Sequence, residues 1–318
     1  MPHVLTITMN PALDVSASTA KVEHTRKLRC QQVQRHPGGG GINVARVLHR
    51  LGVDCGALFP VGGSTGQLLT QLLDAEGVPC WPVQVAGHIR ESFTVRDEHS
   101  GQEFRFVLPG PALGELEQQA CLSQLRSLTP SPLYVVASGS LPPGVPDSFY
   151  AELAPIAAQM GAKLVVDSSG LALSAALRKG VFMLKPSLGE MRMLASEPLP
   201  TMAAVVDCAQ RWIALGRVQV LAVSMGEMGA LLVTAQGAWF APPLKVKVVS
   251  AVGAGDSFVA GMVSALVHSD DLVHAFKMGV ACASAALAQA GTSLCDPPQV
   301  QRLFAEVLCM QTLPQYSI

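Results

Sequence analysis

The sequence predicts an α/β protein with a mostly parallel sheet that helices cover on both faces, and with a smaller sheet projecting from it. Short β-branched segments alternate with segments of helical apolar periodicity along most of the 318 residues. Hydrophobic residues make up 49% of the chain, enough for a large core. Since no linker, low-complexity tract or internal repeat divides it, we expect a single domain spanning residues 1–318.

The first third is expected to begin with a strand at 4–8. That strand runs into a turn at Asn10 and Pro11, which places Asp14 just beyond a strand end. Apolar residues at helical spacing predict helices over 42–51 and 65–76, with a strand over 55–61 between them.

Residues 81–109 show a different pattern. Short segments at 92–95 and 103–107 flank a turn at Ser100 and Gly101, which predicts antiparallel strands that project from the main sheet. Residues 15–36 are expected to contribute to the same projection.

Regular alternation resumes beyond Gly110. Strands are expected at 133–137, 163–166, 181–184 and 218–223, and helices at 147–160 and 202–215. The last third is expected to hold a hairpin over 229–249 that turns near Gly237, followed by helices over 254–268, 271–290 and 298–310.

Composition narrows the range of partners. With a net charge of -1 and 14% charged residues, the chain lacks the broad field that binds nucleic acid or an anionic membrane, so a small ligand is expected. The apolar stretches 259–267 and 280–287 fall short of the roughly 18–20 residues of a membrane span. Eight cysteines without a C-x-x-C pair, and a start without a signal-peptide pattern, predict a cytoplasmic protein with reduced thiols.

The strongest local signal is the run SAVGAGDSF at 250–258, which follows a predicted strand and opens an apolar helix. Its glycines leave the first helical amides free to bind an anion. Spacing alone leaves Asp256 open to two readings, a helix cap or a catalytic base. The small residues Gly253, Ala254 and Gly255 exceed what a cap requires and favour a base for phosphoryl transfer. The chain has no Gly-Lys dipeptide and no His-Arg-Asp, which excludes the P-loop and the protein-kinase motifs.

Weaker signals lie elsewhere. The glycines at 38–41 run into a helix start at Asn43, and this pattern favours close approach of a ligand over a flexible turn. The run 224–229 is by itself typical of a plain turn. Lys27, Arg90 and Arg105 fall in the projecting segments, where single basic residues are usually just solvated. Arg105 lies between two phenylalanines of one strand, which could aim its guanidinium at a phosphate.

Taken together, these residues resemble the ribokinase-like carbohydrate kinases, and within them the ATP-dependent 6-phosphofructokinase type. The resemblance extends from Thr8 to Cys295. It rests on PALD at 11–14, GGGGINVAR at 38–46, FRFV at 104–107 followed by PG, SGSLPPG at 138–144, VDSSG at 166–170 and VGAGDS at 252–257.

The resemblance implies a ribokinase-like fold and transfer of the ATP γ-phosphoryl group to fructose 6-phosphate. Asp256 would be the base, and the amides of Gly253, Ala254 and Gly255 would stabilise charge. It also implies that the projecting segments, about 15–36 and 81–109, form a lid and a homodimer contact. The phosphosugar would be bound by Asp14, Lys27, Gly39, Gly40, Gly41, Asn43, Arg90, Arg105 and Ser140.

For the cofactors, the resemblance implies ATP bound with Mg²⁺, which Glu190 would hold through water. The nucleotide would lie across Lys185, Ser187, Ser224, Gly226 and Gly229. Members of this family often bind K⁺ as well, and the similar positions here are Ser250, Val252, Ala286, Gln289, Gly291 and Ser293.

Departures from the family pattern leave alternatives open. Ser187 replaces the Asn of an Asn-x-x-Glu element, Gly189 lacks a basic residue, and Val248 and Ser293 replace polar or basic residues. These changes leave nucleotide geometry, regulation and cation use open. The alternatives are a tagatose-6-phosphate kinase, a 1-phosphofructokinase, or a non-catalytic sugar-phosphate or nucleotide sensor. The first two tend to carry a lysine within the run that is Gly39 to Gly41 here.

Overall fold

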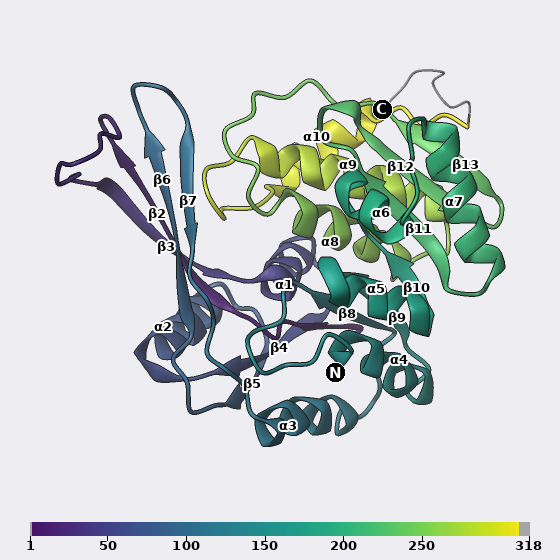
Figure 1. The fold of residues 1–318 in the computed structure, drawn as a ribbon, viewed down its shortest axis with the longest axis horizontal. Coiled ribbons are helices and arrows are strands. Elements are labelled where there is room, and N and C mark those ends of the chain that lie inside the picture. Colours follow the sequence, from purple (N-terminus) through teal and green to yellow (C-terminus); the bar gives the residue numbers. More distant parts are fainter. Residues whose placement is uncertain (1, 312–318) are drawn as a thin grey trace.

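The computed structural model describes residues 2–311 and contains two β-sheets (Figure 1). The larger sheet has nine strands in the order β13-β12-β11-β10-β9-β8-β1-β4-β5, and all neighbours from β11 to β5 are parallel. Only β12 and β13 are antiparallel additions to it. Its strands are β1 Val4–Ile7, β4 Cys55–Val61, β5 Cys80–Gln84, β8 Tyr134–Ser138, β9 Lys163–Asp167, β10 Val181–Leu184, β11 Val218–Ser224, β12 Ala230–Thr234 and β13 Gly237–Ala241.

Helices cover both faces of this sheet, as the sequence predicts. Alternate residues of each strand enter different cores: Val135 packs with α3, α4, α5 and α7, whereas Val136 packs with α1, α8, α9 and α10. The helices are α1 Gly40–Arg50, α2 Gly63–Ala75, α3 Glu115–Arg126, α4 Phe149–Gln159, α5 Gly170–Lys179, α6 Leu188–Ala195, α7 Met202–Ala214, α8 Ala254–Leu266, α9 Leu272–Leu287 and α10 Pro297–Glu306.

Helices α8 and α9 cross very closely. A Cβ at Gly261 would lie 2.6 Å from the Met278 carbonyl oxygen, and one at Gly279 would lie 2.9 Å from the Phe258 carbonyl oxygen. Phe258 and Phe276 add an edge-on ring contact with centroids 6.0 Å apart. This packing holds α8 firmly, so the first turn of α8 has a fixed position relative to the sheet.

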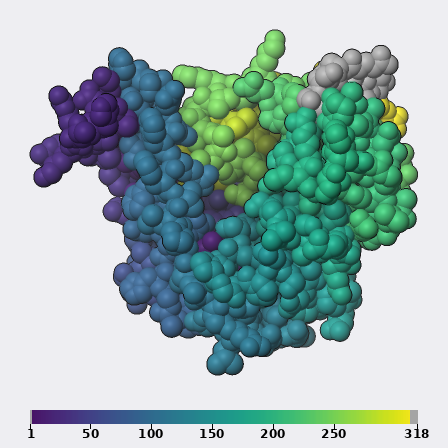
Figure 2. All heavy atoms as spheres, in the orientation of Figure 1, coloured from purple at the N-terminus to yellow at the C-terminus, as the bar shows by residue number. Residues whose placement is uncertain are grey.

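The smaller sheet has the order β3-β2-β6-β7 and projects from the body at the left of Figure 1. Strands β6 and β7 pair antiparallel, as predicted, whereas β2 pairs parallel with β6. A hollow lies between this sheet and the green elements of the body (Figure 2). The strands are β2 Ala12–Thr19, β3 Gln31–Gly38, β6 Arg90–Asp97 and β7 Glu103–Val107.

Some expected boundaries were wrong. Strand β5 pairs in parallel with β4 at the edge of the larger sheet, so residues 81–84 are not part of the projection. The hairpin expected to reach 249 ends at Ala241, because Pro242 and Pro243 follow and cannot donate to a ladder. The last two helices end earlier than predicted, at Leu287 and Glu306.

Three helices were not anticipated from the sequence: α3, α5 and α6. Helix α6 is short, and its opening residues had been interpreted as a nucleotide motif. Within residues 2–311, no helix combines the length and the apolar character that crossing a membrane requires.

Candidate active site

Helix α8 presents Asp256 from its first turn. Gly253 is the N-cap and has φ 75° and ψ 1°, a left-handed conformation that suits glycine. Asp256 therefore stands at the third helical position rather than at the N-cap. Its carboxylate accepts hydrogen bonds from Asn43 Nδ2 at 2.9 Å and from Ser138 Oγ at 3.4 Å. The cap alternative thus does not describe this side chain, which faces the ends of other elements.

The amides of Gly255 and Asp256 lie in the first turn of α8 without an intrahelical acceptor, whereas the Ala254 amide donates to the Ala251 carbonyl at 3.5 Å. Together with the helix dipole they form an anion site beside the carboxylate. Gly255 is half-buried, and a Cβ there would come into ordinary contact with Lys185 Nζ at 3.4 Å. The arrangement provides a proton acceptor next to a place where negative charge is stabilised.

The glycine run before α1 makes close contacts with the protein itself. A Cβ at Gly40 would lie 2.3 Å from Ser138 Oγ, and one at Gly41 would lie 2.6 Å from the Ile7 carbonyl oxygen. Gly39 has φ 111°, which other residues rarely adopt. The run therefore lets α1 start directly against the ends of β1 and β8, which places Asn43 within reach of Asp256.

The electrostatic setting of Asp256 favours a base. Burial raises its pKa, while the hydrogen bond from Asn43 and the charge of Lys185 oppose that rise. The nearby Asp14 carboxylate raises the pKa of Asp256 further, because two like charges disfavour ionisation of both. A carboxylate with a raised pKa is a stronger proton acceptor in its ionised form.

Asp167 is a site residue whose role was not predicted from the sequence. It ends β9 and forms a buried ion pair with Lys185, with Asp167 Oδ1 3.1 Å from Lys185 Nζ. Burial raises the pKa of Asp167 to about 6, although Lys185 opposes this rise. Burial lowers the pKa of Lys185, but Asp167, Glu190 and Asp256 outweigh it, so the net shift is upward. Its position at a parallel strand end, where ligands gather, was the signal that could have identified it.

The predicted sugar-binding side chains converge from β2, β6 and β7. Asp14 and Arg105 line a small cavity with Thr292. Burial raises the pKa of Asp14, against the opposing charges of Arg105 and Arg90. Arg90 donates to the Asn10 carbonyl at 3.2 Å, and its Nε is buried without a hydrogen-bond partner in the described chain.

Ser140 joins this group less directly, because its hydroxyl accepts a hydrogen bond from Asn10 Nδ2 at 3.1 Å. Within one chain, Lys27 does not lie with the other predicted sugar-binding side chains. It lies exposed in the connection between β2 and β3, in the purple loop at the far end of the small sheet in Figure 1.

Three of the five predicted nucleotide residues border a second cavity of about 510 Å³, whereas Lys185 and Ser187 are not part of its lining. Ser224, Gly226 and Gly229 line it together with Ala254 and Gly255 of α8. A Cβ at Gly229 would lie 2.2 Å from the Ala241 carbonyl oxygen, so that glycine is required by the turn into β12 in any case. The rest of the lining is mainly apolar and includes Leu244, Val246, Val248, Phe258, Val280 and Leu287.

Ser187 and Glu190 form a capping box at the start of α6. The Glu190 amide donates to Ser187 Oγ at 3.2 Å, and the Ser187 amide donates to Glu190 Oε2 at 2.7 Å. Serine is a good N-cap, so the replacement of asparagine keeps the local geometry. The charge of Glu190 also acts on Lys185 and Asp167.

Residues 2–311 hold no cluster of three or more metal-ligating side chains. Mg²⁺ at phosphoryl-transfer sites usually keeps several waters and is held by one or two carboxylates plus the phosphates. Asp167, Glu190 and Asp256 all act electrostatically on Lys185, so this part of the site carries acidic groups that fit such an ion.

The six predicted cation positions come from two adjoining segments. The Val249 amide donates to the Leu287 carbonyl at 2.7 Å, which places the residues before α8 beside those after α9. The Ala286 carbonyl accepts from the Gln289 amide at 3.0 Å, and the Ser293 carbonyl accepts from Arg50. A carbonyl oxygen has two lone pairs, so both retain capacity for a cation.

Comparison with known proteins gives consistent similarities. A family model described as pfkB family carbohydrate kinase matches residues 4–299. The chain is 43% identical over 303 residues to an ATP-dependent 6-phosphofructokinase isozyme 2 of Mycobacterium tuberculosis, covering 95% of this chain and 89% of that protein. It is 32% identical over 282 residues to a 1-phosphofructokinase of Bacillus subtilis, covering 89% and 91%.

Among solved structures, phosphofructokinase-2 from Escherichia coli in complex with fructose-6-phosphate is similar, with a TM-score of 0.90 and 37% identity. The match covers 96% of this chain and 99% of that one. Structures of the same protein in complex with potassium and in a tetrameric inhibited form match with TM-scores of 0.91 and 0.88 over the same shares of both chains, at 38% and 37% identity.

Proposed function

This chain belongs to the pfkB family of carbohydrate kinases, and from that premise we propose that it transfers the γ-phosphoryl group of ATP to the 1-hydroxyl of fructose 6-phosphate. The observation that carries the proposal is the placement of Asp256. Its helix start borders the nucleotide-side cavity through Ala254 and Gly255, while the sugar-side cavity reaches the same turn at Val252.

In the proposed reaction, Asp256 accepts the proton of the attacking hydroxyl as the new oxygen–phosphorus bond forms and the bond to ADP breaks. Asn43 holds the Asp256 carboxylate through its amide. The first amides of α8 stabilise the charge on the transferred group, and Lys185 neutralises charge on the nucleotide side. When bound, Mg²⁺ supplies further neutralisation of the phosphates.

On the sugar side, Asp14 and the amides of the run 39–41 are proposed to hold sugar hydroxyls, with Ser140 nearby. Arg90 and Arg105 act electrostatically on Asp14 and are proposed to bind the existing phosphate. Lys27 remains a proposed phosphate ligand, although within one chain it lies away from this group.

Fructose 6-phosphate is favoured as acceptor over fructose 1-phosphate for two reasons. Identity to the 6-phosphofructokinase relative is 43%, against 32% to the 1-phosphofructokinase. The run 39–41 also lacks a lysine. A sensor role is disfavoured, because binding alone needs no base beside an anion site.

We propose K⁺ as a further cofactor at the two adjoining segments near 250 and 290, since their carbonyls keep lone pairs for it. A homodimer through the small sheet is also proposed. Val33, Phe106 and Val107 on that sheet are apolar and 48%, 57% and 56% exposed, and exposed sheet faces and edges favour association. A cytoplasmic location stays a prediction.

The test is a panel of fructose 6-phosphate, tagatose 6-phosphate and fructose 1-phosphate assayed with ATP and Mg²⁺, each with and without K⁺. The proposal requires the highest kcat/KM with fructose 6-phosphate. A higher value with another member would reassign the acceptor, and no turnover with any member would favour the sensor.

A further inference from the structure

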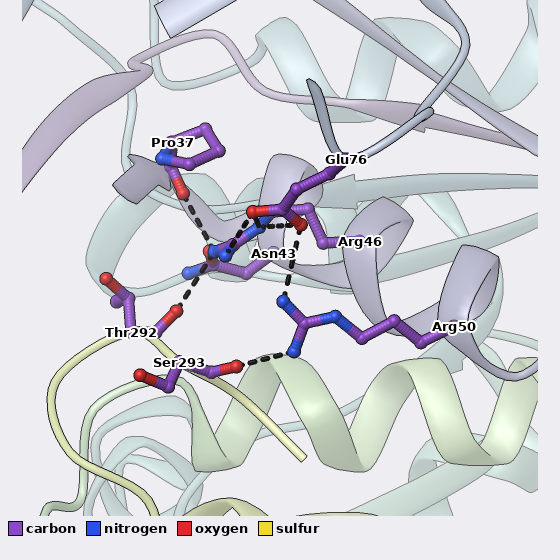
Figure 3. A network of polar contacts seen from close by, with 7 residues as sticks. All are labelled: Pro37, Asn43, Arg46, Arg50, Glu76, Thr292 and Ser293. Atoms are coloured by element: carbon purple, nitrogen blue, oxygen red, sulfur yellow. Dashed lines mark hydrogen bonds and ion pairs between the residues drawn. The ribbon is translucent and has the colours of Figure 1, made fainter. Parts of the chain in front are cut away.

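An ion pair with a fully buried arginine lies one residue away from the candidate base, with Asn43 between them. Arg46 of α1 has a side-chain exposure of 0% and faces Glu76, the residue at the C-terminal cap of α2. Arg46 Nε donates to both Glu76 oxygens at 3.0 and 2.9 Å, and Nη2 donates to Oε1 at 2.7 Å (Figure 3). A buried ion pair is weak evidence for stability, because apolar residues of similar volume often serve as well.

The third nitrogen of Arg46 connects separate parts of the site. Nη1 donates to the Pro37 carbonyl at 3.0 Å, to Asn43 Oδ1 at 3.3 Å and to the Thr292 carbonyl at 3.0 Å (Figure 3). These acceptors belong to the end of β3, to α1 and to the loop after α9. One guanidinium thus joins three segments that border the candidate site.

The contact with Asn43 determines which way its amide faces. A guanidinium only donates, so it selects the amide oxygen of Asn43 and leaves Nδ2 to donate to Asp256 Oδ2 at 2.9 Å. In the opposite orientation, Asn43 would turn an oxygen toward the carboxylate, and two acceptors would repel each other.

The contact with Thr292 acts on the other carboxylate. Arg46 fixes the backbone carbonyl of Thr292, while the Thr292 side chain hydrogen-bonds to Asp14. The Arg46 guanidinium is therefore linked to Asp256 through Asn43 and to Asp14 through Thr292.

We propose that Arg46, oriented by Glu76, is a positioning residue that sets the Asn43 amide toward Asp256 and the Thr292 loop toward Asp14. The inference rests on the proposed kinase function. It assigns a role to two residues that line neither of the two cavities.

Arg46→Lys and Glu76→Gln test this role. Lysine keeps the charge but cannot hold Glu76 with two nitrogens while reaching Asn43 and Thr292. Glutamine keeps the shape of the side chain and an oxygen that accepts from Arg46, but it removes the counter-charge of a fully buried guanidinium, so the free energy of unfolding of both variants is measured alongside. Both should lower kcat about 10- to 100-fold while KM for ATP stays within about twofold.

A double-mutant cycle separates positioning from general stability. If Arg46 acts through Asn43, the effect of Arg46→Lys on kcat should shrink in an Asn43→Ala background. An equal effect in both backgrounds would contradict the proposal. Leu153→Ala in α4, fully buried in the opposite core, is the control for lost stability and should keep kcat.

A readout independent of turnover is the NMR titration of the Asp256 carboxyl carbon in the free enzyme. The other charged groups facing Asp256 are Lys185, Asp14 and Asp167, and the variants leave all three in place. Loss of the Asn43 hydrogen bond should raise the pKa of Asp256 in Arg46→Lys and Glu76→Gln. An unchanged pKa overturns the inference even if the wild type is an active kinase. A raised pKa of Asp256 supports the positioning role of Arg46 even if no sugar phosphate of the acceptor panel is turned over. That combination of results would reject only the proposed kinase function.

Discussion

The cavity beside Asp14 and the cavity beside Ser224 both border the turn at 251–255, but different groups line them. The first presents charged side chains, Asp14 and Arg105, with Arg90 acting on the same carboxylate. The second presents glycine backbone and mainly apolar side chains, with Ser224, Glu227 and Ser284 as its polar lining. Charged groups recognise a ligand by geometry and charge, whereas apolar walls tolerate replacement. Substitutions should therefore have larger effects on the sugar side than on the nucleotide side.

The turn that leads into Asp256 borders both cavities, so the loss of the Asp256 carboxylate should have the largest effect. Asp256→Asn keeps the hydrogen-bonding shape but cannot accept the substrate proton, so kcat should fall about 10²- to 10⁴-fold with phosphosugar binding retained. Steady-state kinetics and calorimetric binding of fructose 6-phosphate measure the two quantities. Near-normal turnover would remove Asp256 as the base.

Arg105→Ala tests the cavity beside Asp14, whose lining is charged. Losing one guanidinium from the proposed phosphate site should raise KM for the phosphosugar about 10- to 100-fold and leave KM for ATP nearly unchanged. Arg96→Ala is the matched control, because Arg96 lies exposed on the adjacent strand β6 and pairs in register with Glu103. Equal effects of both variants would argue for a general loss of positive charge.

Ser187, which forms a β-bridge with Ser224 of the second cavity, tests the nucleotide side. Ser187→Asn restores a residue that also caps helices, so KM for ATP should change less than about threefold. Ser187→Ala removes the hydroxyl that accepts from the Glu190 amide and should lower the free energy of unfolding by about 1 kcal/mol. Chemical denaturation and ATP kinetics check both. A larger kinetic effect than that of Arg105→Ala would reverse the comparison.

The smallest expected effects are opposite shifts of the acid limb of the kcat–pH profile. Activity should fall as pH drops through the raised pKa of Asp256, since the protonated acid cannot accept a proton. Lys185 lowers that pKa and Asp14 raises it, so Lys185→Met should move the limb to higher pH and Asp14→Asn to lower pH. Shifts of the same sign would show that the two sides do not act separately on the base.

Elements with strong local patterns were predicted well. The strand at 55–61 and the helices at 42–51 and 202–215 agree with β4, α1 and α7 to within one or two residues. Helix α3 was missed although its buried residues, Gln118, Cys121, Leu122 and Leu125, recur at helical spacing, because one of the four is polar and only three apolar residues mark the buried face. Helix α6 was missed because Ser187 and Glu190 were interpreted as ligand residues rather than as a capping box.

For the candidate site, the sequence indicated Asp256 and the glycine run before Asn43 but not the roles of Asp167, Arg46 or Glu76. The helix start and the glycines depend on local backbone requirements, which short segments reveal. An ion pair between two strand ends or two helices leaves no local pattern.

By itself, the sequence determined the α/β alternation, the start of α8 at the small residues 253–255 and the set of polar groups at strand and helix ends. Only the tertiary structure decided which of these meet. Asn43 and Asp256 are 213 residues apart, and Arg46 and Thr292 are 246 apart. They meet because the strand order of the sheet brings α1 and α8 side by side in one core, where Val44 and Val47 lie with Val259 and Val263. Strand order depends on the packing of the whole core, so no single segment encodes it.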